Sequence, residues 1–305
     1  MGKNFWNQGI VRRWVLGLAM LAGIVLLSAP FVACGSEDVK SSEETSAVAS
    51  SSSGFFDSNG VRIHYETYGA GEPLIMVHGF TGSIESGLQE KDLVDALQPG
   101  RKLVFIDVRG HGQSDKPHDE EAYSLENMAS DVLNLMDYLG IEKADLYGYS
   151  MGAGISHHLL AFHQDRFNAV VLGGTGSNME PNPQVIADIV AQMLLADDPT
   201  TIANPGLRDW RDRVDANPNS DRLALAACAK RFLPLSDHMT AEDVADVDIP
   251  VLIIVGSEDA VTANLPNLVA AIPGVKYVEV PGRTHEDATS DPMFAREVAT
   301  FLSEN

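Results

Sequence analysis

The sequence predicts an α/β protein: a mostly parallel eight-stranded sheet with helices on both faces and a helical cap inserted between strands 6 and 7. Three uninterrupted apolar runs, at residues 73–77, 169–172 and 250–255, are typical of strands buried on both faces of a parallel sheet. Glycine-rich or polar loops follow each run. A long stretch of helical patterns separates the last two runs, and this stretch is the expected cap.

Residues 148–152 read Gly-Tyr-Ser-Met-Gly, between a short strand pattern at 144–147 and a helix pattern at 153–160. A strand that turns sharply into a helix strains the backbone of its central residue, so the neighbouring positions must lack bulk. The pattern predicts that Ser150 stands exposed at the end of the strand as a nucleophile. The alternative is a glycine-rich turn that contains an incidental serine.

A nucleophilic serine requires a base and an acid that orients the base. The apolar run ending at Gly256 is followed by Ser-Glu-Asp at 257–259, and the next strand pattern, 275–280, is followed by His285. Side chains that follow neighbouring parallel strands meet at the same edge of a sheet, where open α/β sheets bind ligands. We therefore expect His285 and a carboxylate from 257–259 to lie beside Ser150.

The chain resembles the α/β-hydrolase superfamily, specifically its capped esterase, lactonase and C–C hydrolase branch, over essentially residues 55–305. The matching segments, in order, are His78–Phe80, Asp107–Asp115, Gly148–Gly152, Gly256–Asp259 and His285. The resemblance implies Ser150 as nucleophile, His285 as base and Asp259 as acid. It also implies an oxyanion hole formed by the backbone N–H groups of Phe80 and Met151.

The expected reaction is hydrolysis of a carboxylic ester or lactone through an acyl-enzyme, with no metal and no organic cofactor. C–C bond hydrolysis and cofactor-free perhydrolysis use the same three residues and remain alternatives. A non-catalytic envelope binding protein on the same scaffold is an alternative of another class. The expected substrate is a small ester or lactone, and the oligomeric state is left open.

Several residues near these motifs are expected to be structural. His78 and His111 each lie in a glycine-flanked loop and are expected to hold loop backbone. Asp107 ends a strand that precedes the nucleophile strand, which favours a loop-organising role. Arg109 and Asp115 are expected to pair with each other within that loop.

The cap is expected at about residues 178–246. Residues 184–195 place apolar side chains on one helical face, and 207–214 and 221–232 are further helix patterns. Thr240 with Asp243 indicates the start of a short returning helix. The candidates to line a pocket over Ser150 are Met193, Trp210, Phe232 and Met239.

The N-terminus predicts export. Basic residues precede an uncharged run from Trp14 to Phe31, as in a signal peptide. Val-Ala-Cys at 32–34 resembles the end of a lipoprotein signal, although Phe31 replaces the usual leucine. We therefore expect a signal peptide at 1–33, with lipidation at Cys34 and anchoring to a membrane of the bacterial cell envelope. An uncleaved membrane helix, plain secretion and a twin-arginine signal are the alternatives.

A serine-rich tether is expected at 34–53, followed by the hydrolase domain at 54–305. The second cysteine, Cys228, lies in an alanine-rich helix pattern and is expected to be a small buried hydrophobe. The net charge of −22 excludes nucleic acid as a partner, because the chain would repel phosphates.

Overall fold

The computed structural model describes residues 50–175, 183–234, 242–262 and 265–305. Cys34, the predicted signal peptide and most of the predicted tether lie outside these residues. Eight strands form one sheet: β1 (Ser50–Ser58), β2 (Val61–Gly69), β3 (Glu72–Val77), β4 (Arg101–Ile106), β5 (Ala144–Tyr149), β6 (Phe167–Gly173), β7 (Val251–Gly256) and β8 (Lys276–Val280).

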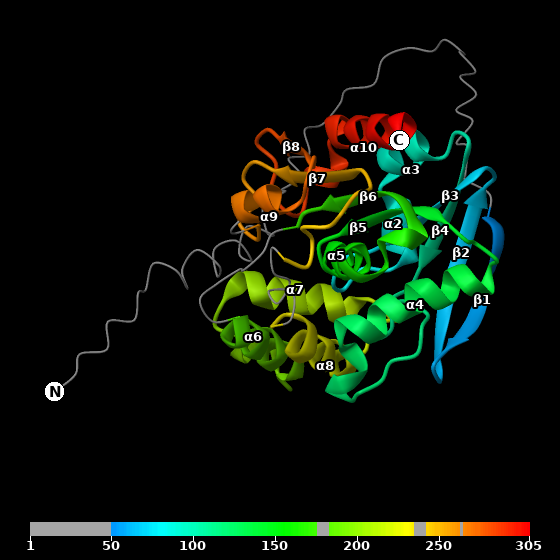
Figure 1. Ribbon diagram of the computed structural model, residues 1–305. Helices are drawn as coiled ribbons and strands as arrows, with labels where there is room; N and C mark the ends of the chain where they lie inside the picture. Colours follow the sequence, from blue (N-terminus) through cyan, green and yellow to red (C-terminus); the bar gives the residue numbers. More distant parts are fainter. Residues whose placement is uncertain (1–49, 176–182, 235–241, 263–264) are drawn as a thin grey trace, which may run out of the picture.

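The strand order is β1-β2-β4-β3-β5-β6-β7-β8. The pairs β1·β2 and β2·β4 are antiparallel, and every other neighbouring pair is parallel. Strand β5, which ends directly before Ser150, therefore lies in the middle of the parallel part, with β6, β7 and β8 following on one side (Figure 1). The predicted fold class is confirmed.

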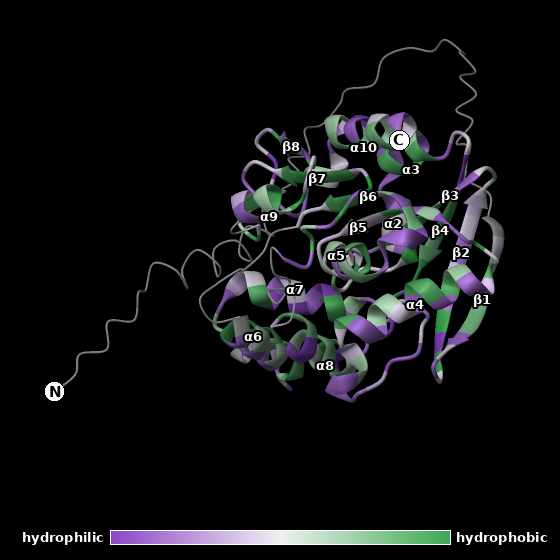
Figure 2. Cartoon of the chain, in the orientation of Figure 1, coloured by the Kyte–Doolittle hydropathy of each residue, from purple (hydrophilic) through white to green (hydrophobic). Residues whose placement is uncertain are grey.

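Helices cover both faces of the sheet. On one face lie α4 (Leu125–Tyr138), α5 (Met151–His163) and α9 (Leu265–Ala271), and on the other lie α2 (Ile84–Gln89), α3 (Lys91–Leu97) and α10 (Pro292–Glu304). Successive side chains along β3 point to opposite faces of the sheet and so contribute to two separate cores. Ile75 and Val77 belong to the core on the first face, and Leu74 and Met76 to the core on the second. Figure 2 shows the hydrophobic colour along the central strands and mixed colours on the surrounding helices.

The insertion between β6 and β7 consists of α6 (Pro183–Leu195), α7 (Pro205–Ala216) and α8 (Arg222–Phe232). These helices have an apolar core of their own, which includes Val190, Leu207 and Leu225. Helix α8 also joins the main core, where Cys228 is fully buried against Met151. The structure thus confirms the helical cap and the buried, apolar character of Cys228.

The remaining short helices are single 3₁₀ turns: η1 (Glu120–Tyr123), η2 (Gln164–Arg166), η3 (Pro199–Thr201) and η4 (Ala288–Ser290). Within the described ranges no helix is both long enough and apolar enough to cross a bilayer.

Two local expectations differ from the structure. Residues 50–53, predicted as the end of the tether, begin β1 and pair with β2, because backbone hydrogen bonding to a neighbouring strand does not require apolar side chains. The returning helix is not formed in its described part, since residues 242–246 are turns; Thr240 lies outside the described residues.

Candidate active site

Ser150 lies between the last residue of β5 and the first residue of α5, with φ 54° and ψ −113°. Positive φ is costly for a residue with a side chain, and it occurs here because the backbone on both sides is held. The Ser150 N–H donates to the carbonyl of Gly173 (2.9 Å), and its own carbonyl accepts from Gly154 N–H (3.0 Å). The side-chain oxygen is thereby directed away from the sheet.

The two glycines of the motif allow close backbone approach. A Cβ on Gly148 would lie 2.2 Å from the carbonyl oxygen of Gly152, and a Cβ on Gly152 would lie 2.1 Å from that of Val77. Both contacts are with backbone atoms, which cannot rotate away. The two glycines are therefore required by the close packing of the backbone at this turn. The prediction of a sharp strand-to-helix turn is confirmed.

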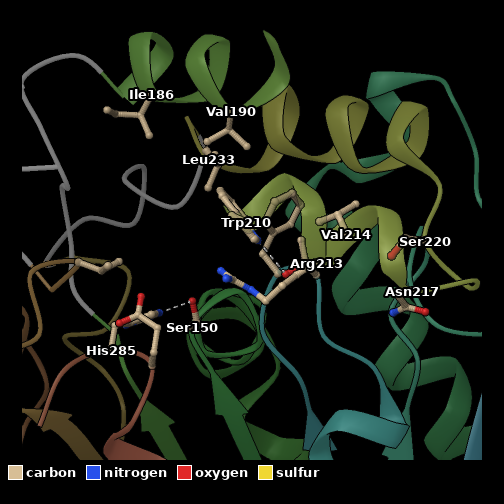
Figure 3. A pocket seen from close by; sticks show the side chains of 14 residues that line it. Ser150, Ile186, Val190, Trp210, Arg213, Val214, Asn217, Ser220, Leu233 and His285 are labelled. Carbon is tan, nitrogen blue, oxygen red and sulfur yellow. Dashed lines mark hydrogen bonds between the residues drawn. The ribbon is translucent and has the colours of Figure 1, made fainter. Parts of the chain in front are cut away.

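The structure brings the three predicted side chains together. His285 Nε2 lies 2.8 Å from Ser150 Oγ, and His285 Nδ1 lies 2.8 Å from Asp259 Oδ2 (Figure 3 shows the first bond). With Nδ1 donating to the carboxylate, Nε2 is the acceptor that faces the serine hydroxyl. This is the geometry of a nucleophile, a base and an orienting acid.

Backbone hydrogen bonds join the loops after β7 and β8 and thereby fix the positions of Asp259 and His285 relative to each other. Ser257 N–H donates to the carbonyl of Val280 (3.0 Å), and Glu258 N–H donates to that of Arg283 (2.9 Å). The Asp259 side chain is fully buried and also accepts from Val261 N–H (2.8 Å). The carboxylate is thus fixed toward His285, whereas its neighbour Glu258 is exposed.

The predicted oxyanion donors lie at two turns beside Ser150. Met151 is the first residue of α5, so its N–H has no acceptor within the helix and lies at the positive end of the helix dipole. Phe80 is a central residue of a turn that is closed by a hydrogen bond from Gly82 N–H to Gly79 O (3.0 Å). The Phe80 N–H takes no part in this hydrogen bond. At the next position of this turn, Thr81 has φ 63°.

His78 and Asp107 organise the loops under the site, as predicted. His78 Nδ1 donates to Gly79 O (2.8 Å) while Nε2 accepts from Val108 N–H (3.0 Å), an arrangement that requires the neutral ring. Burial lowers the pKa of His78 and favours the same form. Asp107 accepts from the backbone of Ile84 and Gln113 and from His64.

His111 is also buried, and burial lowers its pKa to about 3. Its Nδ1 lies 3.0 Å from the carbonyl of Arg109, and its ring contacts Phe80 edge-on at 5.7 Å between centroids. It therefore supports the turn that carries a predicted oxyanion donor.

The expected pair of Arg109 and Asp115 is wrong. The Arg109 guanidinium donates two bonds of 2.7 Å to Asp131 of α4, and both side chains are buried. Asp115 instead accepts from Arg62 N–H of β2 (3.0 Å). The loop is thus tied to two neighbouring elements, because each charged group finds its partner across the fold rather than along the chain.

A cavity of about 400 Å³ lies between Ser150 and the cap. The cap contributes apolar side chains from α6 and α7, among them Ile186, Val190 and Trp210 (Figure 3). Trp210 also contacts the Phe80 ring edge-on (5.9 Å between centroids), and its Nε1 lies 3.4 Å from Thr81 Oγ1. The cap thereby touches the turn that carries a predicted oxyanion donor.

Of the predicted pocket residues, Trp210 lines this cavity, and Phe232 lines a smaller one of about 70 Å³ that also reaches Ser150. Met193 instead belongs to the apolar core of the cap, and Met239 lies outside the described residues. His157, which the helix pattern did not distinguish from its neighbours, lines the smaller cavity.

His157 is buried with no hydrogen-bond partner for Nε2 in the described structure. Burial lowers its pKa to about 4. In the same described ranges, no three histidine, cysteine or acidic side chains converge as metal ligands would.

A family model described as the alpha/beta hydrolase fold matches residues 72–214. Among curated relatives, an AB hydrolase superfamily protein of Bacillus subtilis is 27% identical over 217 residues, which are 66% of this chain and 79% of the relative. A bifunctional epoxide hydrolase 2 of Rattus norvegicus is 31% identical over 127 residues, 41% of this chain and 22% of that protein.

Among solved structures, the enol-lactonase of Burkholderia xenovorans superposes with a TM-score of 0.63 at 25% identity. The match covers 82% of this chain and 100% of the enol-lactonase. The similarity therefore extends over both the sheet and the cap region, beyond the motifs alone.

Proposed function

We propose that the chain is a serine hydrolase of the α/β-hydrolase superfamily that cleaves a carboxylic ester or lactone through an acyl-enzyme. The family-model match over residues 72–214 and the similarity to an AB hydrolase superfamily protein and to an enol-lactonase structure support this proposal. The observation that carries the proposal is the pair of 2.8 Å hydrogen bonds joining Ser150 to His285 and His285 to Asp259. The cavity above Ser150 supports it, because it provides space for a small organic substrate at the nucleophile.

In the first half of the proposed reaction, Ser150 Oγ attacks the substrate carbonyl carbon while His285 Nε2 takes the hydroxyl proton. Asp259 stabilises the resulting imidazolium, and the N–H groups of Phe80 and Met151 bind the oxyanion. The tetrahedral intermediate then collapses. The bond to the leaving oxygen breaks, and this oxygen receives the proton from His285.

In the second half, His285 takes a proton from water as the water oxygen attacks the acyl carbon. Collapse of this second intermediate returns the proton to Ser150 Oγ and releases the acid. Each oxyanion-hole donor is expected to contribute about 3 kcal/mol to transition-state stabilisation.

The type of nucleophile argues against epoxide opening, although an epoxide hydrolase is among the relatives. Attack of a serine oxygen on an epoxide carbon would form an ether, which has no carbonyl for water to attack, so the enzyme would be trapped. C–C bond hydrolysis and perhydrolysis remain compatible with the same side chains.

A substrate panel tests the proposal. Full-length protein is assayed with chromogenic esters of increasing acyl length, small lactones, a vinylogous diketone and peracid formation, each beside Ser150→Ala. We expect ester or lactone turnover that Ser150→Ala abolishes. Turnover of the diketone alone, or no turnover of any substrate, would contradict the proposed reaction.

We further propose that the chain is an exported lipoprotein whose acylated Cys34 anchors it to an envelope membrane. The basic N-terminus, the uncharged run to Phe31 and Cys34 support this. Intact mass of the native protein tests it. A lipid-modified species that begins at Cys34 is expected, and an unmodified chain that retains residues 14–31 would contradict it.

A further inference from the structure

The cavity above Ser150 contains one cationic side chain that the catalytic mechanism does not use. Arg213 lies in the last turn of α7, on the cap wall of the cavity. Figure 3 shows its guanidinium extending toward Ser150 and His285, whereas Asn217 and Ser220 lie farther along the cavity. The positive charge is therefore directed to the part of the cavity where a reacting carbonyl would be placed.

Arg213 differs from the other arginines of the described ranges. Most of them form ion pairs with a carboxylate, namely Arg62, Arg101, Arg109, Arg166, Arg211, Arg222, Arg231, Arg283 and Arg296. Arg208 donates to the carbonyl of Ile202. Within those ranges, Arg213 is the arginine with neither an ion pair nor a side-chain hydrogen bond.

Arg213 is exposed, so its guanidinium is hydrated rather than paired, although acidic residues are abundant nearby. The chain has 43 acidic residues against 21 lysines and arginines, and α7 itself contains Asp209, Asp212 and Asp215. Of these, Asp215 pairs with Arg211 and Arg222 rather than with Arg213. The cap thus leaves the Arg213 guanidinium unpaired on the cavity wall, while Arg211 and Arg222 both pair with Asp215.

We propose that Arg213 selects substrates that carry a carboxylate near the scissile carbonyl, such as monoesters or lactones of acid-bearing compounds. This inference rests on the proposed function. A planar guanidinium pairs with a carboxylate through two parallel hydrogen bonds. In a protein whose net charge of −22 repels anions, binding such a substrate requires a local positive group, and Arg213 supplies it.

The remaining charge on the cavity wall favours a monoanion over a phosphate. Glu286 is the acidic side chain that lines this cavity in the described structure, and it is exposed. A phosphate dianion would be repelled by Glu286 with only one guanidinium to offset it. A single carboxylate matches the single cation.

The test compares mono-4-nitrophenyl adipate with its methyl ester, which has the same chain without the charge. Full-length parent protein, Arg213→Gln and Arg222→Gln are assayed with both compounds after subtraction of enzyme-free hydrolysis. Arg222→Gln is the matched control, because it removes the same charge from the neighbouring cap helix but from outside the cavity.

We expect the parent to prefer the acid in kcat/KM, and Arg213→Gln to reduce this preference by about tenfold or more, mainly through KM. Arg222→Gln should keep the preference within about twofold, and Glu286→Gln should increase it. A parent that treats the two compounds alike, or an unchanged preference in Arg213→Gln, would overturn the proposal.

A binding measurement separates this inference from the proposed reaction. Calorimetry of monomethyl adipate with Ser150→Ala, and with Ser150→Ala combined with Arg213→Gln, requires no turnover. Loss of binding in the double variant supports the role of Arg213 even if no ester is cleaved. Equal binding by the two proteins contradicts it even if ester turnover is observed.

Discussion

The edge of the sheet that carries the proposed catalytic residues and the cap above it are built in different ways. At the edge, Ser150, Asp259 and His285 are fixed by backbone hydrogen bonds and by glycines at which an added Cβ would lie only about 2 Å from neighbouring backbone atoms. In the cap, the cavity wall consists of side chains on α6 and α7, such as Val190 and Arg213, whose positions depend on helix packing.

This difference indicates that the edge of the sheet determines the rate of the reaction and that the cap determines the choice of substrate. Backbone geometry tolerates little change, so the reaction should be sensitive to small substitutions at the edge. Side chains on the cap wall can change without disturbing the sheet, so they should alter substrate choice and KM. The following substitutions test this division, beginning with the largest expected effect.

Asp259→Asn should reduce kcat by about ten-thousandfold while preserving the fold. The amide is unable to hold the His285 tautomer that presents Nε2 to Ser150. Steady-state kinetics with a neutral chromogenic ester measure the effect. Glu258→Gln is the control, because it makes the same charge change one residue away at an exposed position and should stay within about threefold of the parent.

Gly152→Ala and Gly154→Ala compare the two regions within one helix. A Cβ at Gly152 would lie 2.1 Å from the Val77 carbonyl oxygen, whereas a Cβ at Gly154 would meet the tip of the Phe232 ring of α8 at 2.9 Å. Gly152→Ala should lower the free energy of unfolding by about 3 kcal/mol or more and lower kcat strongly. Chemical denaturation and ester kinetics measure both quantities.

Gly154→Ala should cost less, about 1 kcal/mol, because the Phe232 ring can move. Its main effect should be on KM, since Phe232 lines the smaller cavity beside Ser150. Equal losses of kcat in the two variants would contradict the division between edge and cap.

Glu90 should make the stability of the catalytic region depend on pH. It lines a cavity of about 180 Å³ behind Phe80, and burial raises its pKa from 4.5 to about 7, with a hydrogen bond from Thr289 opposing the shift. Between these two values the folded protein retains a proton that the unfolded chain has lost. The stabilisation is therefore complete below pH 4.5 and is lost as the pH rises through 7.

The shift corresponds to about 3 kcal/mol. Glu90→Gln should remove this component, so the variant should gain stability relative to the parent between pH 4.5 and 8. Urea denaturation at several pH values measures the difference. A pH-independent difference between variant and parent would show that Glu90 is ionised in the folded protein.

Val190→Ala should raise KM for the longer esters by about tenfold and leave kcat within about threefold. The Val190 side chain lines the main cavity. Removing methyl groups from an apolar substrate pocket typically costs roughly 1–3 kcal/mol of binding to the substrate groups that fill it. Leu194→Ala is the control, because Leu194 lies in the cap core as Val190 does but is not among the cavity-lining side chains of the described residues. It should lower stability more than Val190→Ala and affect KM less.

The same contrast explains how much the sequence could predict. The edge was predictable for two reasons. The turn at Ser150 requires glycines on either side of it. The ends of neighbouring parallel strands bring Asp259 and His285 together. One prediction at this edge, the pairing of Arg109 with Asp115, was wrong. Asp131 lies 22 positions from Arg109 on a helix, and no local spacing indicates that pair.

The cap was predictable only as a set of helices. Helix α7 carries six charged residues, and the pattern does not separate Arg211 from Arg213. In the structure, Arg211 is buried and bonded to backbone carbonyls of α6 and the loop after it, whereas Arg213 lines the cavity. Which of two nearby arginines faces a substrate depends on how the helix packs, and packing is not encoded in local spacing.

Labelling with a fluorophosphonate tests the central claim most directly, because only an activated serine reacts. Full-length parent protein should be modified once, on the peptide that contains Ser150, and neither Ser150→Ala nor His285→Ala should react appreciably. Mass spectrometry of the digested protein locates the label. Unchanged labelling in Ser150→Ala, or no labelling of the parent, would contradict the assignment of Ser150 as the nucleophile and with it the proposed hydrolase function.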